Sequence, residues 1–170
     1  MIKTVDGNIL EASEDIICHQ VNCKGVMGAG LAKQIKSKYP NVYKEYKQIC
    51  AEHGDDLLSS VQLITTSDGK TIANLFAQTG YGRKRMQTDY DALRSCLQSL
   101  KDTVTHSHEE KKQTSIAIPY GIGCGLAGGD WAIVEGMIEE VLGDCEVTVY
   151  RFRYGYFEIY KNRHTKTLLD

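Results

Sequence analysis

Residues 16–32 read Ile16-Ile17-Cys18-His19-Gln20-Val21-Asn22-Cys23-Lys24-Gly25-Val26-Met27-Gly28-Ala29-Gly30-Leu31-Ala32, and the fold prediction for this chain begins with them. The mostly apolar run 16–21 predicts a buried strand. Three glycines follow it, and an apolar spacing typical of a helix continues after them. Strand, glycine-rich loop and helix in this order direct backbone N–H groups toward a phosphate. The stretch therefore predicts a phosphate-binding loop, with a tight turn that merely packs a helix on a sheet as the alternative.

The glycine spacing separates this loop from two common nucleotide motifs. No Gly-Lys-Ser or Gly-Lys-Thr closes it, so it is not a P-loop. Its glycines run G-x-x-G-x-G rather than G-x-G-x-x-G, the fingerprint of dinucleotide-binding enzymes. Such an enzyme also needs an acidic residue about 20 positions further on, at a strand end. Glu45 and Glu52 fall within a predicted helix instead, which makes a nicotinamide-dependent enzyme a distant alternative.

Composition indicates one ordinary globular domain. The chain has 170 residues, of which 42% are hydrophobic and 25% charged, and its formal net charge is −2. That charge produces no overall attraction to nucleic acid. No apolar run reaches the roughly 18 residues of a membrane span, and the N-terminus lacks the pattern of a signal peptide. We therefore expect a cytoplasmic protein with no membrane partner.

The six cysteines indicate free thiols rather than a metal site. None forms a C-x-x-C pair, so we expect no zinc, no other metal and no cofactor. One of them lies inside a second glycine-rich segment, where a nucleophilic role is a minor alternative because no histidine is near it in sequence. The cysteines are Cys18, Cys23, Cys50, Cys96, Cys124 and Cys145.

Strands and helices alternate along the rest of the chain. Apolar patterning and turn residues predict further strands over 2–5, 61–65, 71–77, 115–118 and 147–150, with 61–65 and 71–77 pairing antiparallel. Helices are expected over 28–37, over 42–52 with Asn41 as its cap, after a cap at Thr88 or Asp89, and over 131–142 with Asp130 as its cap. This alternation predicts an α/β fold with a mixed, mainly parallel sheet.

A second glycine-rich loop, residues 121–129, follows the strand 115–118. We call it the second loop, and residues 24–30 the first loop. Both follow predicted parallel strands, whose carboxyl ends meet at one edge of the sheet. Two sets of backbone donors facing each other suit a diphosphate better than a single phosphate.

Four segments together give the chain its family resemblance. They are Gly7-Asn8-Ile9-Leu10, then His19-Gln20-Val21-Asn22-Cys23-Lys24-Gly25 leading into Met27-Gly28-Ala29-Gly30, then Pro119-Tyr120-Gly121-Ile122-Gly123-Cys124-Gly125-Leu126, and finally Val147-Thr148-Val149-Tyr150. In this order and spacing they resemble a macrodomain, the ADP-ribose-binding module. The resemblance implies a three-layer α/β/α fold over residues 1–151, followed by a C-terminal extension over 152–170 that adds a strand or lies across the surface.

The resemblance implies a binding mode for ADP-ribose. Asn8 replaces the usual aspartate that accepts a hydrogen bond from the adenine amino group, with Ile9 beside it. The first loop would wrap the distal ribose and the adjoining phosphate, and residues 123–127 of the second loop would form the opposite wall. Tyr150 or Phe152 would stack on adenine, with core packing as the alternative. The implied binding residues are Asn8, Ile9, Gln20, Lys24, Gly25, Val26, Met27, Gly28, Ala29, Gly30, Gly123, Cys124, Gly125, Leu126, Ala127 and Tyr150.

Within the family the chain is similar to a branch that holds a terminal ADP-ribose protein glycohydrolase and stand-alone ADP-ribose 1''-phosphate phosphatases. The glycohydrolase pairs a lysine nucleophile with an aspartate, but Ala127 stands at the aspartate position. Asp130 is read as a helix cap and Lys84 as part of a solvated basic loop. His19 and Asn22 match the phosphatases and are the candidate catalytic residues, one to move a proton or orient water, the other to hold water or ribose hydroxyls.

The expected function is therefore hydrolysis at the distal ribose of an ADP-ribose derivative, with ADP-ribose 1''-phosphate as the favoured substrate. Two alternatives remain open. One is a hydrolase that removes ADP-ribose from protein or nucleic acid, or acyl groups from O-acyl-ADP-ribose, which would make an ADP-ribosylated macromolecule a partner. The other is a non-catalytic ADP-ribose reader.

Overall fold

The computed structural model describes residues 2–106 and 113–152, which form a six-stranded sheet in the order β1-β6-β5-β2-β4-β3. All neighbouring strands are parallel except β3 and β4, which form the predicted antiparallel hairpin. The predicted mixed, mainly parallel sheet is thus confirmed. The strands are β1 (Ile2–Asp6), β2 (Ile16–Val21), β3 (Val61–Thr65), β4 (Thr71–Phe76), β5 (Ser115–Pro119) and β6 (Glu146–Arg151).

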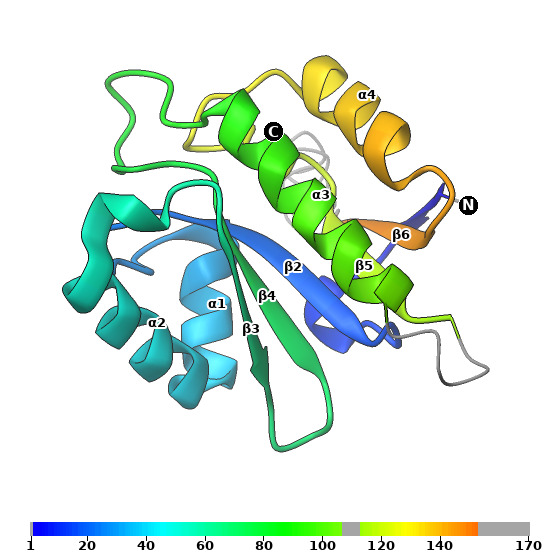
Figure 1. Ribbon diagram of the computed structural model, residues 1–170, viewed down its shortest axis with the longest axis horizontal. Helices are drawn as coiled ribbons and strands as arrows, with labels where there is room; N and C mark the ends of the chain where they lie inside the picture. The colour runs from blue at the N-terminus through cyan, green and yellow to red at the C-terminus, as the bar shows by residue number, and fades with distance from the viewer. Residues whose placement is uncertain (1, 107–112, 153–170) are drawn as a thin grey trace, which may run out of the picture.

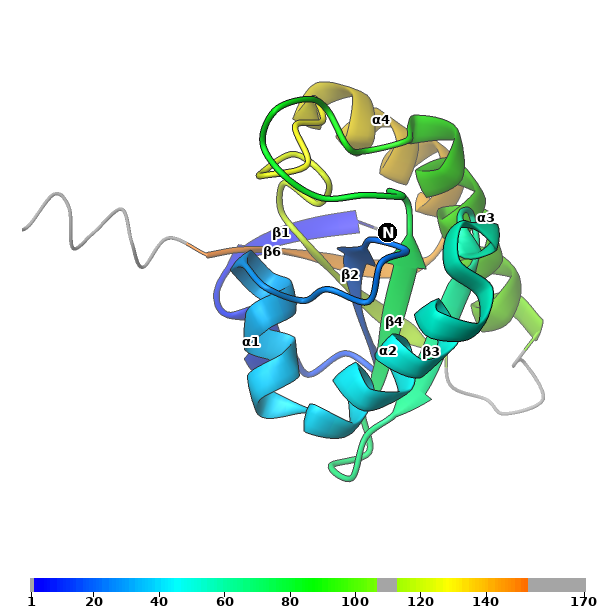
Figure 2. The same ribbon diagram turned by 90° about the vertical axis from the view of Figure 1, so that its left-hand side faces the viewer.

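Helices cover both faces of this sheet, which gives three layers (Figures 1 and 2). Helices α1 (Gly30–Lys38) and α2 (Pro40–His53) lie on one side, and α3 (Tyr90–His106) and α4 (Trp131–Leu142) lie on the other. Alternation along β2 explains the arrangement, because successive side chains of a strand point to opposite faces. Cys18 packs in the core beneath α3 and α4. Ile17 packs in the core beneath α1.

The helix boundaries differ from the predicted ones where proline and backbone geometry override the pattern. Helix α1 begins at Gly30 rather than residue 28, after Ala29 in an extended conformation. The Asn41 cap is wrong: α2 starts two residues earlier than predicted, with Pro40 as its first residue and Tyr39 at the cap position. Proline suits that position because the first helical N–H groups have no partner within the helix.

Aspartates begin the other two long helices as predicted. The side chain of Asp130 accepts a hydrogen bond from the backbone N–H of Ala132 at 2.9 Å. Asp89 accepts one from Ala92 N–H, also at 2.9 Å, which decides between the two caps proposed for α3. Across the described residues, none of the helices combines the length and the apolar character that crossing a bilayer requires.

Strands β2 and β5 separate before they end, and this separation makes room for a site. Their pairing covers only Ile16 with Ile116 and Ile17 with Ala117. Strand β2 nevertheless continues to Val21, paired along its other edge with β4. The crossovers on the two sides of this pair run over opposite faces, so β2 and β5 flank the topological switch point where open α/β sheets bind ligands.

Candidate functional site

A cavity of about 580 Å³ lies beyond the carboxyl ends of β2 and β5. Its volume falls within the range of about 300–1,000 Å³ that is usual for small-molecule sites. Both glycine-rich loops line it, Gly28 from the first and Gly125 from the second, so the prediction that the two loops meet at one edge of the sheet is confirmed. Of the implied site residues, those lining the cavity are His19, Gln20, Asn22, Val26, Gly28, Ala29, Gly30, Gly123, Gly125, Leu126 and Ala127.

The first loop leads the N-terminus of α1 to the cavity wall. Residues 28–32 line the cavity, and Ala29 supplies no side-chain hydrogen bond to the first turn of the helix. The first N–H groups of a helix have no intrahelical partner and carry a partial positive charge. This end of the cavity therefore suits an anionic group such as a phosphate.

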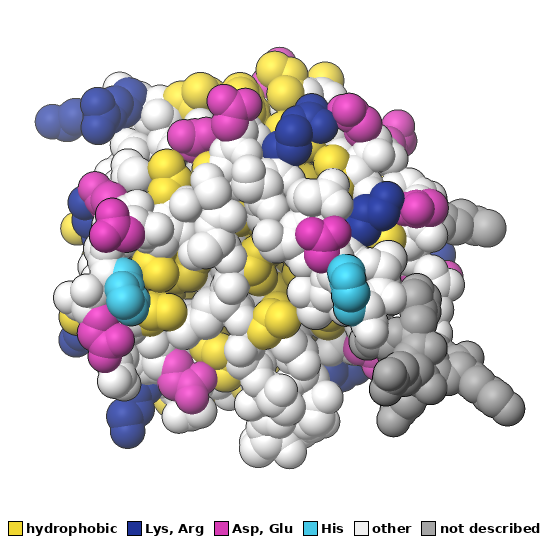
Figure 3. All heavy atoms as spheres, viewed as in Figure 1, with side chains coloured by type: hydrophobic (Ala, Val, Ile, Leu, Met, Phe, Trp, Pro, Cys, Tyr) yellow, Lys and Arg dark blue, Asp and Glu magenta, His cyan; other side chains and the backbone are white. Residues whose placement is uncertain are grey.

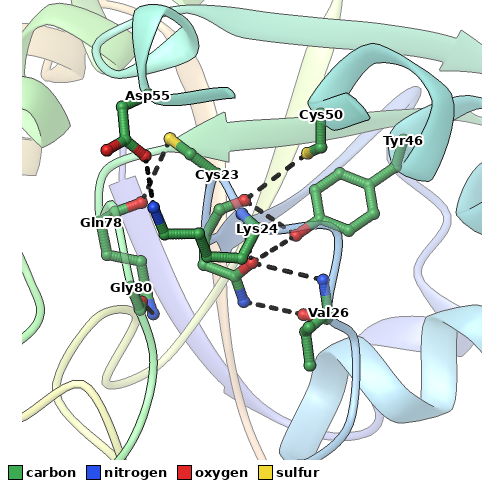
Figure 4. Close-up of polar contacts among 9 residues, drawn as sticks. Cys23, Lys24, Val26, Tyr46, Cys50, Asp55, Gln78 and Gly80 are labelled. Atoms are coloured by element: carbon green, nitrogen blue, oxygen red, sulfur yellow. Dashed lines mark hydrogen bonds and ion pairs between the residues drawn. The ribbon is translucent and has the colours of Figure 1, made fainter. Parts of the chain in front are cut away.

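Asn22 shapes the first loop from within, through contacts with Val26 and Tyr46, both of which are labelled in Figure 4. Its side-chain Oδ1 accepts hydrogen bonds from the backbone N–H groups of Lys24 at 3.0 Å and Val26 at 3.3 Å. The hydroxyl of Tyr46 lies 2.8 Å from the same oxygen. The Nδ2 group donates to the carbonyl of Val26 at 2.8 Å. These contacts occupy the amide, so its evident role is to hold the loop, and a direct part in chemistry stays a prediction.

His19 is buried in the cavity wall and has one hydrogen-bond partner. It is 2% exposed, and its Nε2 lies 2.5 Å from Oδ1 of Asn74 on β4. Burial lowers the pKa of His19 to about 4, and the hydrogen bond to Asn74 opposes this only in part. The imidazole is therefore neutral near pH 7. Its Nδ1 is buried and has no hydrogen-bond partner among the described residues.

A second polar network fixes the far wall of the cavity. The Nε2 group of Gln20 donates to Gln78 Oε1 at 2.8 Å and to Thr88 Oγ1 at 2.9 Å. The Thr88 hydroxyl donates to the carbonyl of Gly123 at 2.6 Å. The backbone N–H groups of Gln87 and Thr88 both donate to Ala127 O. The network joins β2, the segment after β4 and the second loop.

The basic loop, residues 80–87, forms part of the cavity rim. Tyr81, Gly82 and Arg83 line the cavity, whereas Lys84 and Arg85 do not. All three cations are exposed, and Lys and Arg side chains project where this loop leaves the body of the molecule, at the upper left of Figure 3. Among the described residues that line the cavity, Arg83 is the one with a permanent charge, and no aspartate, glutamate or lysine lines it.

Several implied binding residues lie outside the cavity lining. Asn8 caps a short 3-10 helix by accepting from Leu10 N–H at 3.0 Å. Lys24 pairs with Asp55 at 2.9 Å, and Tyr150 donates its hydroxyl proton to Glu14 at 2.6 Å. Ile9, Gly25, Met27 and Cys124 also lie outside the lining, so ligand contacts of these residues and of Asn8, Lys24 and Tyr150 stay predictions.

The thiol of Cys124 is poorly placed for nucleophilic attack. Its Sγ lies 3.3 Å from the carbonyl oxygen of Ile122. Burial raises the pKa of this thiol, and the nearby charge of Asp130 raises it further. A cysteine nucleophile needs the opposite shift. No disulfide joins any of the six cysteines within the part of the chain that the structure describes.

Sequence patterns missed part of the cavity wall. Tyr120 lines it, is 44% exposed and packs against Trp131 with ring centroids 4.6 Å apart. Tyr120 stands directly before the second loop, but no sequence pattern tells which side of a loop faces a ligand. Gln78 and Gln87 lie far from both loops in sequence and reach the cavity only because the chain folds. The missed lining residues are Val21, Leu31, Ala32, Gln78, Tyr81, Gly82, Arg83, Gln87, Pro119, Tyr120, Gly121 and Ile122.

Two curated relatives match most of this chain. An ADP-ribose 1''-phosphate phosphatase of Saccharomyces cerevisiae is 27% identical over 173 residues, which cover 88% of this chain and 98% of the relative. A DNA ADP-ribosyl glycohydrolase of Thermus aquaticus is 31% identical over 146 residues, covering 86% of this chain and 39% of the relative. The chain thus matches nearly the whole phosphatase and about two fifths of the glycohydrolase.

A solved structure and a family model agree with these relatives. The macrodomain of Thermus aquaticus DarG has 28% sequence identity and a TM-score of 0.70, and the match covers 89% of this chain and 97% of that one. The family model described as Macro domain matches residues 18–138, well over half of the chain and both glycine-rich loops. The fold, the shared cavity and these matches together show that the chain belongs to the Macro domain family.

Proposed function

We propose that this protein binds ADP-ribose in the cavity between its glycine-rich loops and hydrolyses ADP-ribose 1''-phosphate to ADP-ribose and inorganic phosphate. In this reaction a water oxygen bonds to phosphorus, the bond from phosphorus to the anomeric oxygen breaks, and that oxygen takes up a proton that the water gives up. The observation that carries the proposal is the charge of the cavity wall, whose described residues include Arg83 and the N-terminus of α1 but no carboxylate.

Such a wall suits a ligand with several phosphates. Anionic lining groups would repel the two phosphates of ADP-ribose and repel the third phosphate of the 1''-phosphate more strongly still. A guanidinium pairs with phosphate through two parallel hydrogen bonds, which makes Arg83 the candidate for the terminal phosphate. The phosphatase relative, which this chain matches over nearly its whole length, supports the same assignment.

A non-catalytic reader is the second candidate, and one observation favours it. Besides neutral His19, the described residues of the lining include no second histidine and no aspartate, glutamate, cysteine or lysine that could exchange a proton with a substrate. Tight binding needs only the loop donors and a fitting cavity.

Removal of ADP-ribose from a macromolecule is the third candidate and rests on the glycohydrolase relative. A lysine–aspartate mechanism has less support in this chain. Ala127 lines the cavity at the position expected for the aspartate, Lys84 does not line it, and Asp130 caps α4.

Three measurements on the purified chain distinguish the candidates. Phosphate release from ADP-ribose 1''-phosphate, above that of His19→Ala, is the expected result. No release above that variant overturns the phosphatase assignment and leaves binding untouched. Mass analysis of ADP-ribosylated DNA or protein after incubation detects the hydrolase alternative. Calorimetric binding of ADP-ribose with no turnover in either assay identifies a reader.

A further inference from the structure

Three polar side chains form a row across neighbouring strands on the α1 and α2 side of the sheet. His19 on β2 stands opposite Asn74 on β4, and Asn74 stands opposite Gln62 on β3. Residues directly opposite one another point to the same face of a sheet. Asn74 is fully buried, and Ile17 and Ile72 on the same face belong to an apolar core. Polar side chains inside such a core need a specific reason to be there.

The hydrogen bonds along this row show which side-chain atoms donate and which accept. Asn74 Nδ2 donates to Oε1 of Gln62 at 3.0 Å. The amide of Asn74 therefore turns its Oδ1 to His19, at 2.5 Å from Nε2. A carbonyl oxygen only accepts, so the proton of this contact belongs to Nε2. A neutral imidazole has a single N–H, and Nδ1 is left with a bare lone pair.

That lone pair is buried, yet it has no partner among residues 2–106 and 113–152. Nδ1 of His19 makes no hydrogen bond to these residues, and His19 lines the cavity. Buried polar atoms in folded proteins nearly always have a partner, and the exceptions often mark functional positions. Pro119 lines the same cavity, at the end of β5 beyond the last pairing of β5 with β2, so no strand is paired with this part of β2 on that side.

We infer that Asn74 is a positioning residue that fixes His19 as the Nε2–H tautomer, so that Nδ1 accepts a hydrogen bond from a hydroxyl group of the bound ligand. The distal ribose of ADP-ribose carries such hydroxyls, and the ligand part of the inference rests on the proposed function. Gln62 acts one step further out, because it orients the amide of Asn74.

This tautomer sets what His19 does. It orients the ribose by accepting, and it does not donate a proton to a leaving oxygen from Nδ1. The role of general acid considered for His19 from the sequence is therefore replaced by one of acceptor.

Nitrogen-15 NMR of the imidazole tests the tautomer on the unaltered protein. Long-range proton–nitrogen correlation distinguishes a protonated ring nitrogen from a bare one, and His19→Gln identifies the signal. The expected spectrum without ligand has a protonated Nε2 and a bare Nδ1. A protonated Nδ1 overturns the inference.

Addition of ADP-ribose tests the ligand part. The Nδ1 resonance is expected to move toward the hydrogen-bonded range, while Nε2 changes little. Calorimetric binding without a change at Nδ1 overturns the acceptor role. Absence of binding overturns the proposed function together with the ligand part, and the ligand-free spectrum still decides the tautomer.

Two variants test the positioning role of Asn74. Asn74→Leu keeps the size of the side chain but removes the acceptor, so His19 is expected to populate both tautomers and to bind ADP-ribose about tenfold more weakly. Gln62→Glu keeps an acceptor for Asn74 and is expected to retain the wild-type His19 spectrum. An unchanged spectrum in a folded Asn74→Leu protein contradicts the role assigned to Asn74.

Discussion

The hydroxyl of Tyr46, from the middle of α2, lies 2.8 Å from the side-chain oxygen of Asn22, just beyond the end of β2. The same hydroxyl is 2.8 Å from the backbone carbonyl of Asn22. Tyr46 is fully buried, and burial raises the pKa of its phenol, so the hydroxyl remains a neutral donor. A helix outside the glycine motif thus supports the residue that shapes the first loop.

Removing the hydroxyl of Tyr46 tests whether it stabilises Asn22 and the first loop. Tyr46→Phe should lower the free energy of unfolding by about 0.5–1.5 kcal/mol, because the two oxygens of Asn22 lose one of their donors. ADP-ribose binding should weaken as well, since the loop loses a constraint. Urea denaturation and calorimetry measure both effects. Tyr43→Phe on the same helix is the control, because Tyr43 is only partly buried and makes a ring contact with Lys36 that phenylalanine preserves. Equal effects of the two substitutions would contradict this account.

Two glycines of the second loop should respond differently to alanine. Gly123 has a φ of +73°, and a Cβ there would lie 2.6 Å from Gln20 Oε1. Gly123→Ala should therefore cost more than about 1 kcal/mol and disturb the hydrogen bonds of Gln20 and Thr88. A Cβ at Gly125 meets nothing within 4 Å, so Gly125→Ala should leave thermal stability nearly unchanged. Melting temperatures compare the two, and a similar loss in both would show that the Gln20 contact does not limit position 123.

The buried imidazole predicts a pH dependence of stability. His19 has a pKa of about 4 in the folded protein, lowered by burial from an ordinary value near 6.5. At a pH between these two pKa values, His19 is protonated in the unfolded chain but not in the folded protein. The free energy of unfolding should therefore fall by about 1.4 kcal/mol for each pH unit below about 6.5, and this loss should be complete below about pH 4.

The comparison protein for this effect is His19→Gln, which cannot titrate at this position. Subtracting its urea-unfolding profile from that of the wild type removes the contribution of the carboxyl groups. The difference should grow as pH falls from about 6.5 to about 4. A flat difference would place the folded-state pKa of His19 near its ordinary value.

The position of Arg83 on the cavity wall predicts a preference for an additional phosphate. Arg83→Gln should weaken binding of ADP-ribose 1''-phosphate by about tenfold and binding of ADP-ribose by less, because a charge-assisted contact with phosphate is worth about 1.5–3 kcal/mol. Lys84→Gln is the matched control, since it removes the same charge from a side chain outside the cavity. Calorimetry gives the affinity of each variant for both ligands. If Arg83→Gln weakened the binding of both ligands equally, Arg83 would not contact the additional phosphate.

Local sequence patterns were enough to predict the strands and helices of the sheet layers. They also predicted the edge of the sheet at which the site lies. The strand 16–21 was predicted with its exact bounds, because its apolar run is closed by a glycine-rich segment that cannot extend it. Both loops were located for the same reason, since glycine marks positions where backbone approaches a ligand or adopts a left-handed conformation. Asp130 was read correctly as a cap because capping depends on residues close in sequence.

Which side chains face the cavity, and whether His19 is neutral or charged there, depends on contacts between segments that are distant in sequence. Asn74 and Tyr46 lie 55 and 24 positions from their partners His19 and Asn22, and nothing local in the chain signals either pairing. The neutral state of His19 follows from burial beneath a helix layer, and the placement of Arg83 on the wall, with Lys84 off it, follows from the path of one loop. Hydrogen bonds and desolvation between distant segments exist only once the chain has folded, so no local pattern encodes them.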